Sequence, residues 1–129
     1  MGEEKEGYGP IVIDHFKNPR NVGEMESPDG AGEAINPACG DTMRLFIRIE
    51  GDCIVDATFL TFGCSGAIAA SSITTELLKG KTIDEALQIS NETVAGALGG
   101  LPPTKAHCSV LAEQAVRAAV SDYRKKQTG

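Results

Sequence analysis

An alternation of apolar and polar residues, interrupted once by Gly51-Asp52, constrains the fold of this chain more than any other feature of its sequence. Apolar side chains occupy every second position of residues 43–49, and the pattern resumes at Val55, Ala57 and Phe59. A period of two is typical of strands with one buried face. Gly51-Asp52 fits a two-residue hairpin loop of the type with glycine at its first central position. We therefore expect two antiparallel, neighbouring strands.

The same hairpin brings two cysteines toward one place. Extending its pairing to the strand ends puts Cys39 nominally opposite Cys64, and directly opposed residues have Cβ atoms about 4.5–5.5 Å apart. Asp41 lies two positions from Cys39 and belongs to the same end of the sheet. A β-bulge would shift this register by one residue, so the prediction concerns the shared end of the sheet rather than a distance.

Helical patterns dominate the remaining sequence. The expected elements are a helix at residues 11–16, a short strand near 32–36, helices at 67–79, 82–88 and 91–98, and an amphipathic helix after Pro102-Pro103. Thr82, with Glu85 three residues on, predicts a capping box at the start of the helix at 82–88. His15, on the first helix, is expected to be a packed or surface residue rather than a ligand. The apolar stripe of the last helix is expected at Ala112, Val116, Ala119, Val120 and Tyr123. A sheet followed by helices, without an internal repeat, predicts an α+β fold. We expect one domain at residues 8–126, between a flexible lead-in at 1–7 and a tail at 127–129.

The composition restricts the class of partner. A chain of 129 residues with 41% hydrophobic and 23% charged residues is ordinary for a globular domain. Twelve basic against eighteen acidic residues give a net charge of −6, the wrong sign for binding nucleic acid. No apolar run approaches the length of a membrane span, and the polar start lacks a signal-peptide pattern. We therefore expect a soluble, cytoplasmic protein with neither a nucleic-acid nor a membrane partner.

The four cysteines indicate metal or sulfur chemistry, because disulfides are rare in a reducing compartment. They are Cys39, Cys53, Cys64 and Cys108, and none forms a C-x-x-C pair. Any metal site must therefore be assembled from distant segments. Cys53 lies beside the hairpin loop, at the far end of the sheet from Cys39 and Cys64, so we expect it to be a small buried residue rather than a ligand.

The other three cysteines lie in settings that suit a bound group. Cys64 and Cys108 fall near the starts of expected helices, where the helix dipole and free N–H groups favour a thiolate. Lys105 and His107 flank Cys108 and add positive charge or, for His107, a metal ligand. Together with the carboxylate of Asp41, these groups form a soft, sulfur-rich set suited to zinc, iron or an iron-sulfur cluster.

Six short segments between about Ile13 and Tyr123 form a recognisable set. They are DHFKNPRN at residues 14–21, PACGD at 37–41, TFGC at 61–64, KGKT at 79–82, LPP at 101–103 and KAHCS at 105–109. Together they resemble the IscU and NifU N-terminal family of iron-sulfur cluster assembly scaffolds. By this resemblance, residues 8–126 form an IscU/NifU-like scaffold domain of the SufE/NifU-type fold, a small antiparallel sheet of about three strands with helices packed on one face.

The resemblance implies a scaffold and carrier protein that is not an enzyme. Members of the family assemble a transient 2Fe-2S cluster from iron and from persulfide sulfur supplied by a cysteine desulfurase, and they pass it to apo iron-sulfur acceptor proteins. A ferredoxin-type electron donor and a frataxin-like protein are further partners that it implies. Zinc often occupies the cluster-free site in this family.

The resemblance also assigns the site. The cluster and metal ligands that it implies are Cys39, Cys64 and Cys108, with Asp41 and His107. We expect Cys108, at a helix start with Lys105 and His107 beside it, to accept the sulfur. Three thiols fall short of the four that hold a permanent cluster, so oxygen or imidazole must complete the coordination and release should be easier.

Two departures from the family pattern bear on function. Ser65-Gly66 replaces the commoner Gly-Ser after the second ligand, which leaves the thiol of Cys64 in place. Thr104 stands where the segment recognised by a dedicated DnaK-type chaperone has valine, so docking of that chaperone is not expected. Pro102 and Pro103 have an equally good structural role at the start of the last helix.

Two other functions share these residues. A zinc-dependent sulfur-acceptor protein of the SUF type would use almost the same ligands, although the interval between Cys64 and Cys108 has no room for that group's extra segment. A thiol enzyme with Cys108 as nucleophile and His107 as base is a weaker alternative, because adjacent helical residues point about 100° apart.

Overall fold

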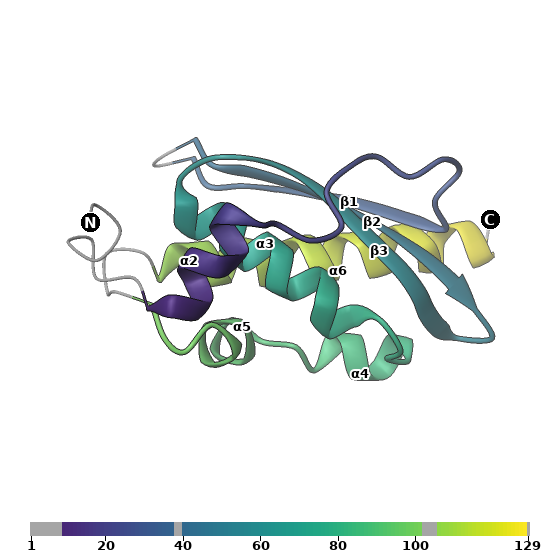
Figure 1. The fold of residues 1–129 in the computed structure, drawn as a ribbon. Coiled ribbons are helices and arrows are strands. Elements are labelled where there is room, and N and C mark those ends of the chain that lie inside the picture. The colour runs from purple at the N-terminus through teal and green to yellow at the C-terminus, as the bar shows by residue number, and fades with distance from the viewer. Residues whose placement is uncertain (1–8, 38–39, 102–105, 129) are drawn as a thin grey trace.

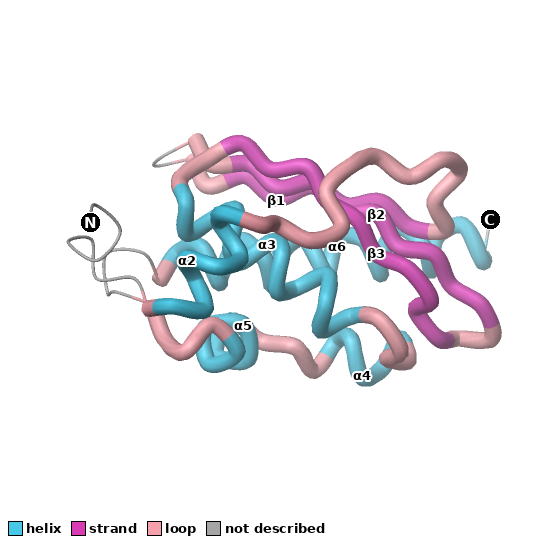
Figure 2. Tube along the Cα trace, viewed as in Figure 1, coloured by secondary structure: helices cyan, strands magenta, loops and turns pink. Residues whose placement is uncertain are grey.

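The structure is a computed structural model that describes residues 9–37, 40–101 and 106–128. Its elements in chain order are α2 (Pro10–Lys17), β1 (Gly30–Ile35), β2 (Thr42–Glu50), β3 (Cys53–Phe62), α3 (Ser65–Leu78), α4 (Ile83–Leu87), α5 (Asn91–Ala97) and α6 (His107–Thr128). The strands form one antiparallel sheet in the order β1-β2-β3. The helices lie together on one side of it (Figures 1 and 2). The expected α+β class and its layers are confirmed.

The hairpin between β2 and β3 has the expected partners at its loop, where Glu50 pairs with Cys53. Its turn type differs from the expectation. Both Gly51 and Asp52 have positive φ, 55° and 66°, whereas the expected type has positive φ only at its first position. Aspartate tolerates this left-handed conformation, and a turn with two such residues matches the twist of the strands.

A β-bulge alters the register one step beyond the loop. Ile49 pairs with Ile54 but Arg48 pairs with Asp56, which leaves Val55 without a partner on β2. The side chain of Val55 is consequently 45% exposed, and our placement of Val55 on one face with Ala57 and Phe59 is wrong. The bulge adds one residue to β3, so the side chains before and after it exchange faces.

The shifted register also changes which residues meet at the other end of the hairpin. Its last pair is Thr42 with Phe62, and one further step places Asp41 opposite Gly63. The nominal pairing of Cys39 with Cys64 is therefore displaced by one residue. Cys39 itself lies outside the described residues.

The long helix α6 packs closely against β1 along the buried face of the sheet. Its apolar stripe is buried as expected at Ala112, Val116, Ala119 and Val120, whereas Tyr123 is only partly buried against the core. Two glycines of β1 make this approach possible, because a Cβ on Gly30 or Gly32 would overlap the backbone of Ala119. The packing fixes where the N-terminal end of α6 lies relative to the sheet.

Helix α2 is held against α3 by a buried polar contact. His15 lies within hydrogen-bonding distance of Ser72, with 2.8 Å between Nδ1 and Oγ, and the backbone N–H of Arg20 donates to the same hydroxyl at 2.9 Å. His15 is buried, so it has the packed, non-ligand role expected of it. Its burial, followed by the nearby charge of Arg20, lowers its pKa.

The short helix α4 begins with the capping box that the sequence predicts. The hydroxyl of Thr82 accepts from the backbone N–H of Glu85 at 3.2 Å, and the Glu85 carboxylate accepts from the N–H of Thr82 at 2.9 Å. This second bond holds the pKa of Glu85 below its usual range.

Within the described ranges, none of the helices has both the length and the apolar character needed to cross a membrane.

Candidate metal centre

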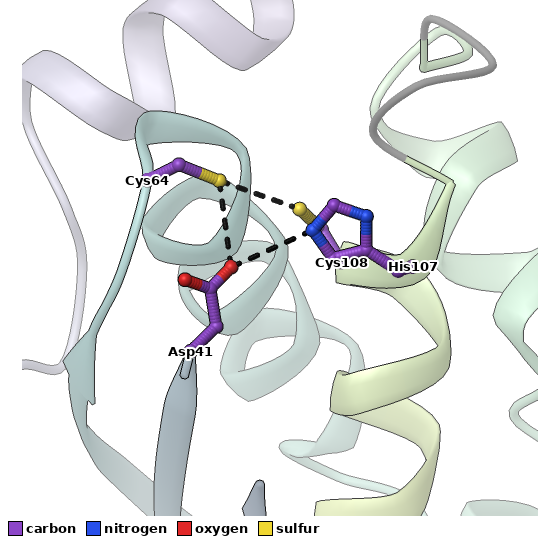
Figure 3. A group of neighbouring side chains, drawn as sticks. All are labelled: Asp41, Cys64, His107 and Cys108. Atoms are coloured by element: carbon purple, nitrogen blue, oxygen red, sulfur yellow. Dashed lines mark hydrogen bonds and ion pairs between the residues drawn. The ribbon is translucent and has the colours of Figure 1, made fainter. Parts of the chain in front are cut away.

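Four potential metal ligands from three parts of the chain meet at one end of the sheet (Figure 3). They are Asp41, Cys64, His107 and Cys108, and each offers one ligand atom within 4.8 Å of all the others. No two of the three segments that carry them are adjacent in the sequence. The fold therefore assembles this group from distant residues, as the absence of a C-x-x-C pair predicts.

Each ligand occupies the end of a regular element. Asp41 directly precedes β2, and Cys64 is the N-cap residue of α3, two positions after β3 ends. His107 and Cys108 are the first two residues of α6. Because β2 and β3 are antiparallel neighbours, the start of one and the end of the other lie together, and α6 adds its N-terminus from the helical layer.

The first turn of α6 is stabilised locally. Both the backbone N–H and the hydroxyl of Ser109 donate to the carbonyl oxygen of Ala106, at 3.2 Å and 2.8 Å. Ser109 is buried, and its hydroxyl bond to Ala106 is partly buried. A role for Ser109 is not among our sequence predictions, although a serine in the first turn of a helix is a common signal for a bond of this kind.

Three of the distances between ligand atoms match those of tetrahedral coordination, and all the ligand atoms lie within 4.8 Å of one another. The Cys64 thiol donates to Oδ2 of Asp41 at 3.6 Å, the sulfurs of Cys64 and Cys108 are 3.6 Å apart, and Nε2 of His107 is 3.6 Å from the same Oδ2. Zinc bonds of about 2.0–2.3 Å at tetrahedral angles put neighbouring ligand atoms about 3.3–3.8 Å apart. Two sulfurs, an imidazole and a carboxylate also match the ligands that zinc and iron accept.

The group has a closed side and an open side among the described residues. Cys108 is 1% exposed and Asp41 is 6% exposed, whereas the side chain of His107 is 32% exposed and Cys64 is half-buried. A pocket of about 240 Å³ adjoins His107, between the end of β1 and the first turns of α6. Among the described residues, Cys64 and His107 are thus the two ligands that are more open to solvent.

The remaining candidate residues lie elsewhere or beyond the described ranges. Cys53 is at the opposite end of β3, where it forms an isolated bridge with Thr82, so it is remote from the group as expected. It is partly exposed rather than buried, because it lies at the strand end beside the hairpin loop. Cys39 and Lys105 fall outside the described residues, as does Thr104. The structure thus brings together four of the five expected ligands.

A small α+β domain that gathers two thiols, an imidazole and a carboxylate at one end of its sheet is typical of proteins that bind a metal ion or a cluster. The model of the NifU-like N terminal domain family matches residues 7–129. The chain belongs to this family.

Its relatives include proteins named for cluster assembly. It is 55% identical over 119 residues to the iron-sulfur cluster assembly scaffold protein IscU 1 of Archaeoglobus fulgidus, covering 92% of this chain and 78% of that protein. It is 50% identical over 124 residues to the iron-sulfur cluster assembly scaffold protein IscU of Escherichia coli K12, covering 93% and 96%.

Solved structures share the fold. A nitrogen-fixing NifU-like protein (N-terminal) from Brucella abortus superposes with a TM-score of 0.67 at 16% identity, covering 93% of this chain and 94% of that one. The protein FiSufU from Fervidobacterium islandicum AW-1 superposes with a TM-score of 0.74 at 24% identity, covering 88% and 96%. At these identities the likeness concerns the fold alone.

Proposed function

We propose that this protein is a scaffold on which a transient 2Fe-2S cluster is built and from which the cluster passes to apo iron-sulfur proteins. The observation that carries the proposal is the compact group of Asp41, Cys64, His107 and Cys108 in a member of a family whose relatives are named as assembly scaffolds. Iron and sulfur are the substrates in this proposal, and a cysteine desulfurase is the sulfur-donating partner.

The proposed ligands are the two described thiols, completed by Cys39 and by an oxygen or nitrogen ligand. The sulfurs of Cys64 and Cys108 are 3.6 Å apart. Asp41 and His107 compete for the remaining position, because each lies within reach of the same centre. A carboxylate is a hard, weak ligand for iron beside thiolates, which favours release over storage.

We propose Cys108 as the first sulfur acceptor, with Lys105 three residues before it in the sequence. Because Cys108 is 1% exposed, this step requires the residues around it to open toward the sulfur donor. Its thiolate attacks the terminal sulfur of the desulfurase persulfide, so a new S–S bond forms on Cys108 while the old S–S bond breaks and the desulfurase thiolate leaves. Reduction of this sulfur to sulfide takes two electrons, which a ferredoxin-type donor supplies. A frataxin-like protein remains a further proposed partner, and the cytoplasm the proposed compartment.

A zinc-dependent sulfur-acceptor protein is the second candidate function. The ligand separations of 3.6 Å are those of a tetrahedral zinc site, and the same thiols would serve. In this alternative zinc is permanent and the product is transferred sulfur rather than a cluster.

Anaerobic reconstitution tests the two functions against each other. The protein would be incubated with iron, cysteine, a cysteine desulfurase and a reductant, and the visible iron-sulfur absorption followed before and after adding an apo-ferredoxin. We expect a chromophore that forms and moves to the ferredoxin. Cys64→Ser should abolish it, and Cys53→Ser, a matched thiol at the far end of the sheet, should not. Retained zinc and transferred sulfur without a chromophore would support the alternative.

A further inference from the structure

Gly63 lies beside the metal centre, at a position where a side chain would strike the proposed ligand Asp41. A Cβ built on Gly63 would lie 2.7 Å from both Cγ and Oδ1 of Asp41, and 3.1 Å from its Cβ. Real Cβ atoms essentially never approach heavy atoms this closely. The register explains the contact, since Asp41 and Gly63 are opposed one step beyond the last pair of the hairpin, and opposed residues direct their side chains to the same face.

The backbone conformation does not itself call for glycine at this position. Gly63 is not among the residues with positive φ, so an alanine could adopt its backbone angles. The remaining reason for a glycine here is lack of space, because the Asp41 carboxylate fills the volume that a side chain on residue 63 would need. The neighbouring Gly40 differs, because its φ of 79° favours glycine irrespective of packing.

Asp41 has little room to move away from an added methyl group. The residue is buried, and its Oδ2 faces Cys64 and His107 at 3.6 Å. Its carbonyl oxygen accepts a hydrogen bond from the backbone of Asn36 at 2.8 Å, which ties the main chain to the strand pairing. A methyl group on residue 63 must therefore either rotate the carboxylate or separate the two strand ends, and both changes move Oδ2 from its place.

We propose that Gly63 is a positioning residue for the metal centre. Because it has no side chain, it leaves room for the Asp41 carboxylate to stay in contact with Cys64 and His107. The proposal rests on the proposed function in taking Asp41 as a ligand. It adds a residue that carries no donor atom and acts only through its neighbour.

Zinc binding to Gly63→Ala tests the proposal without any cluster chemistry. We expect its zinc affinity, measured by competition with a chromophoric chelator, to fall about tenfold or more, as when a residue that orients a ligand is changed. The absorption spectrum of the cobalt(II)-substituted protein should shift in the same direction as that of Asp41→Ala. Gly96→Ala is the matched control, because a Cβ on this glycine meets nothing within 4 Å. Unchanged affinity and spectrum in Gly63→Ala would overturn the proposal.

The double variant Gly63→Ala/Asp41→Ala shows whether the effect passes through Asp41. Once Cγ and Oδ1 are removed, the alanine at position 63 should lower zinc affinity much less than it does in the parent protein, because coupled neighbours are not additive. An equal loss in both backgrounds would mean that Gly63 acts by another route.

Thermal unfolding of the metal-free variants decides the matter even if Gly63→Ala folds poorly. The double variant should be more stable than Gly63→Ala alone, since the carboxylate that meets the methyl group is gone. Failure of this rescue would contradict the proposal. These measurements are independent of the proposed function, which fails instead if the parent protein binds zinc normally but assembles no cluster.

Discussion

Single residues at the metal centre differ in what they contribute to a transient cluster. Cys64 and Cys108 offer soft sulfurs, whereas Asp41 offers a hard oxygen at 3.6 Å from the sulfur of Cys64. The hairpin pattern predicts that Asp41 and Cys64 share one end of the sheet. The sequence does not show that His107 and Cys108 join them, because their position depends on how α6 packs against β1.

The Asp41 carboxylate should keep the cluster labile. In Asp41→Ala we expect the cluster to move to apo-ferredoxin severalfold more slowly than in the parent protein, because a weak, exchangeable ligand is lost. The rate of gain of ferredoxin absorption under anaerobic conditions measures this. A transfer rate equal to that of the parent protein would show that Asp41 has no such role.

His15 should make the stability of the domain depend on pH. Burial lowers its pKa below the usual 6.5, so the unfolded chain takes up this proton at a higher pH than the folded protein. The stability due to neutral His15 is fully present above about pH 6.5 and is lost as the pH falls through its folded pKa. Urea unfolding between about pH 7 and pH 5 should therefore show a decline that is smaller in His15→Gln. Equal declines would contradict this assignment.

At the scale of elements, local sequence signals predicted individual helices and strands better than the places where these elements pair or are connected. The capping box of Thr82 and Glu85 and the apolar stripe of α6 depend on neighbouring residues, and both are confirmed. The bulge at Val55 is not visible in the sequence, because valine suits either face of a strand. How the loop after α2 is held is likewise not visible in a local pattern, since Arg48 donates to the carbonyl oxygen of Glu26 in that loop, 22 residues earlier in the chain.

The contact between β1 and α6 should be intolerant of added volume. In Gly32→Ala the new Cβ would overlap the backbone of Ala119, which cannot move without displacing α6. We expect the free energy of unfolding to fall by about 1–3 kcal/mol, the usual cost of overpacking a core. Chemical denaturation measures it, with Gly96→Ala as the control. A loss below about 0.5 kcal/mol would show that the helix adapts.

For the whole molecule, the metal centre joins the start of β2 to the starts of α3 and α6. An ion bound there links segments that are distant in sequence, and the unfolded chain offers no such site. The arrangement of these segments followed from the resemblance to a family rather than from spacing, since no local pattern relates residue 41 to residue 108.

Zinc should therefore stabilise the folded protein. At a free zinc concentration of about 100 times Kd, the expected gain is about 2.7 kcal/mol, seen as a higher Tm that a chelator reverses. Cys64→Ser should lose most of this gain, and Cys53→Ser should keep it. An equal rise in Tm for Cys64→Ser and the parent protein would place the zinc elsewhere.

The burial of Cys108 and Asp41 bears on the order in which partner proteins bind at the metal centre. Cys108 and Asp41 lie on the closed side of the described residues, and Cys64 and His107 face outward. Under the proposed function, a protein that brings sulfur and a protein that takes the finished cluster would both have to reach the ligands past Cys64 and His107. We therefore expect the two partners to compete for one face of the protein, so that loading and delivery alternate.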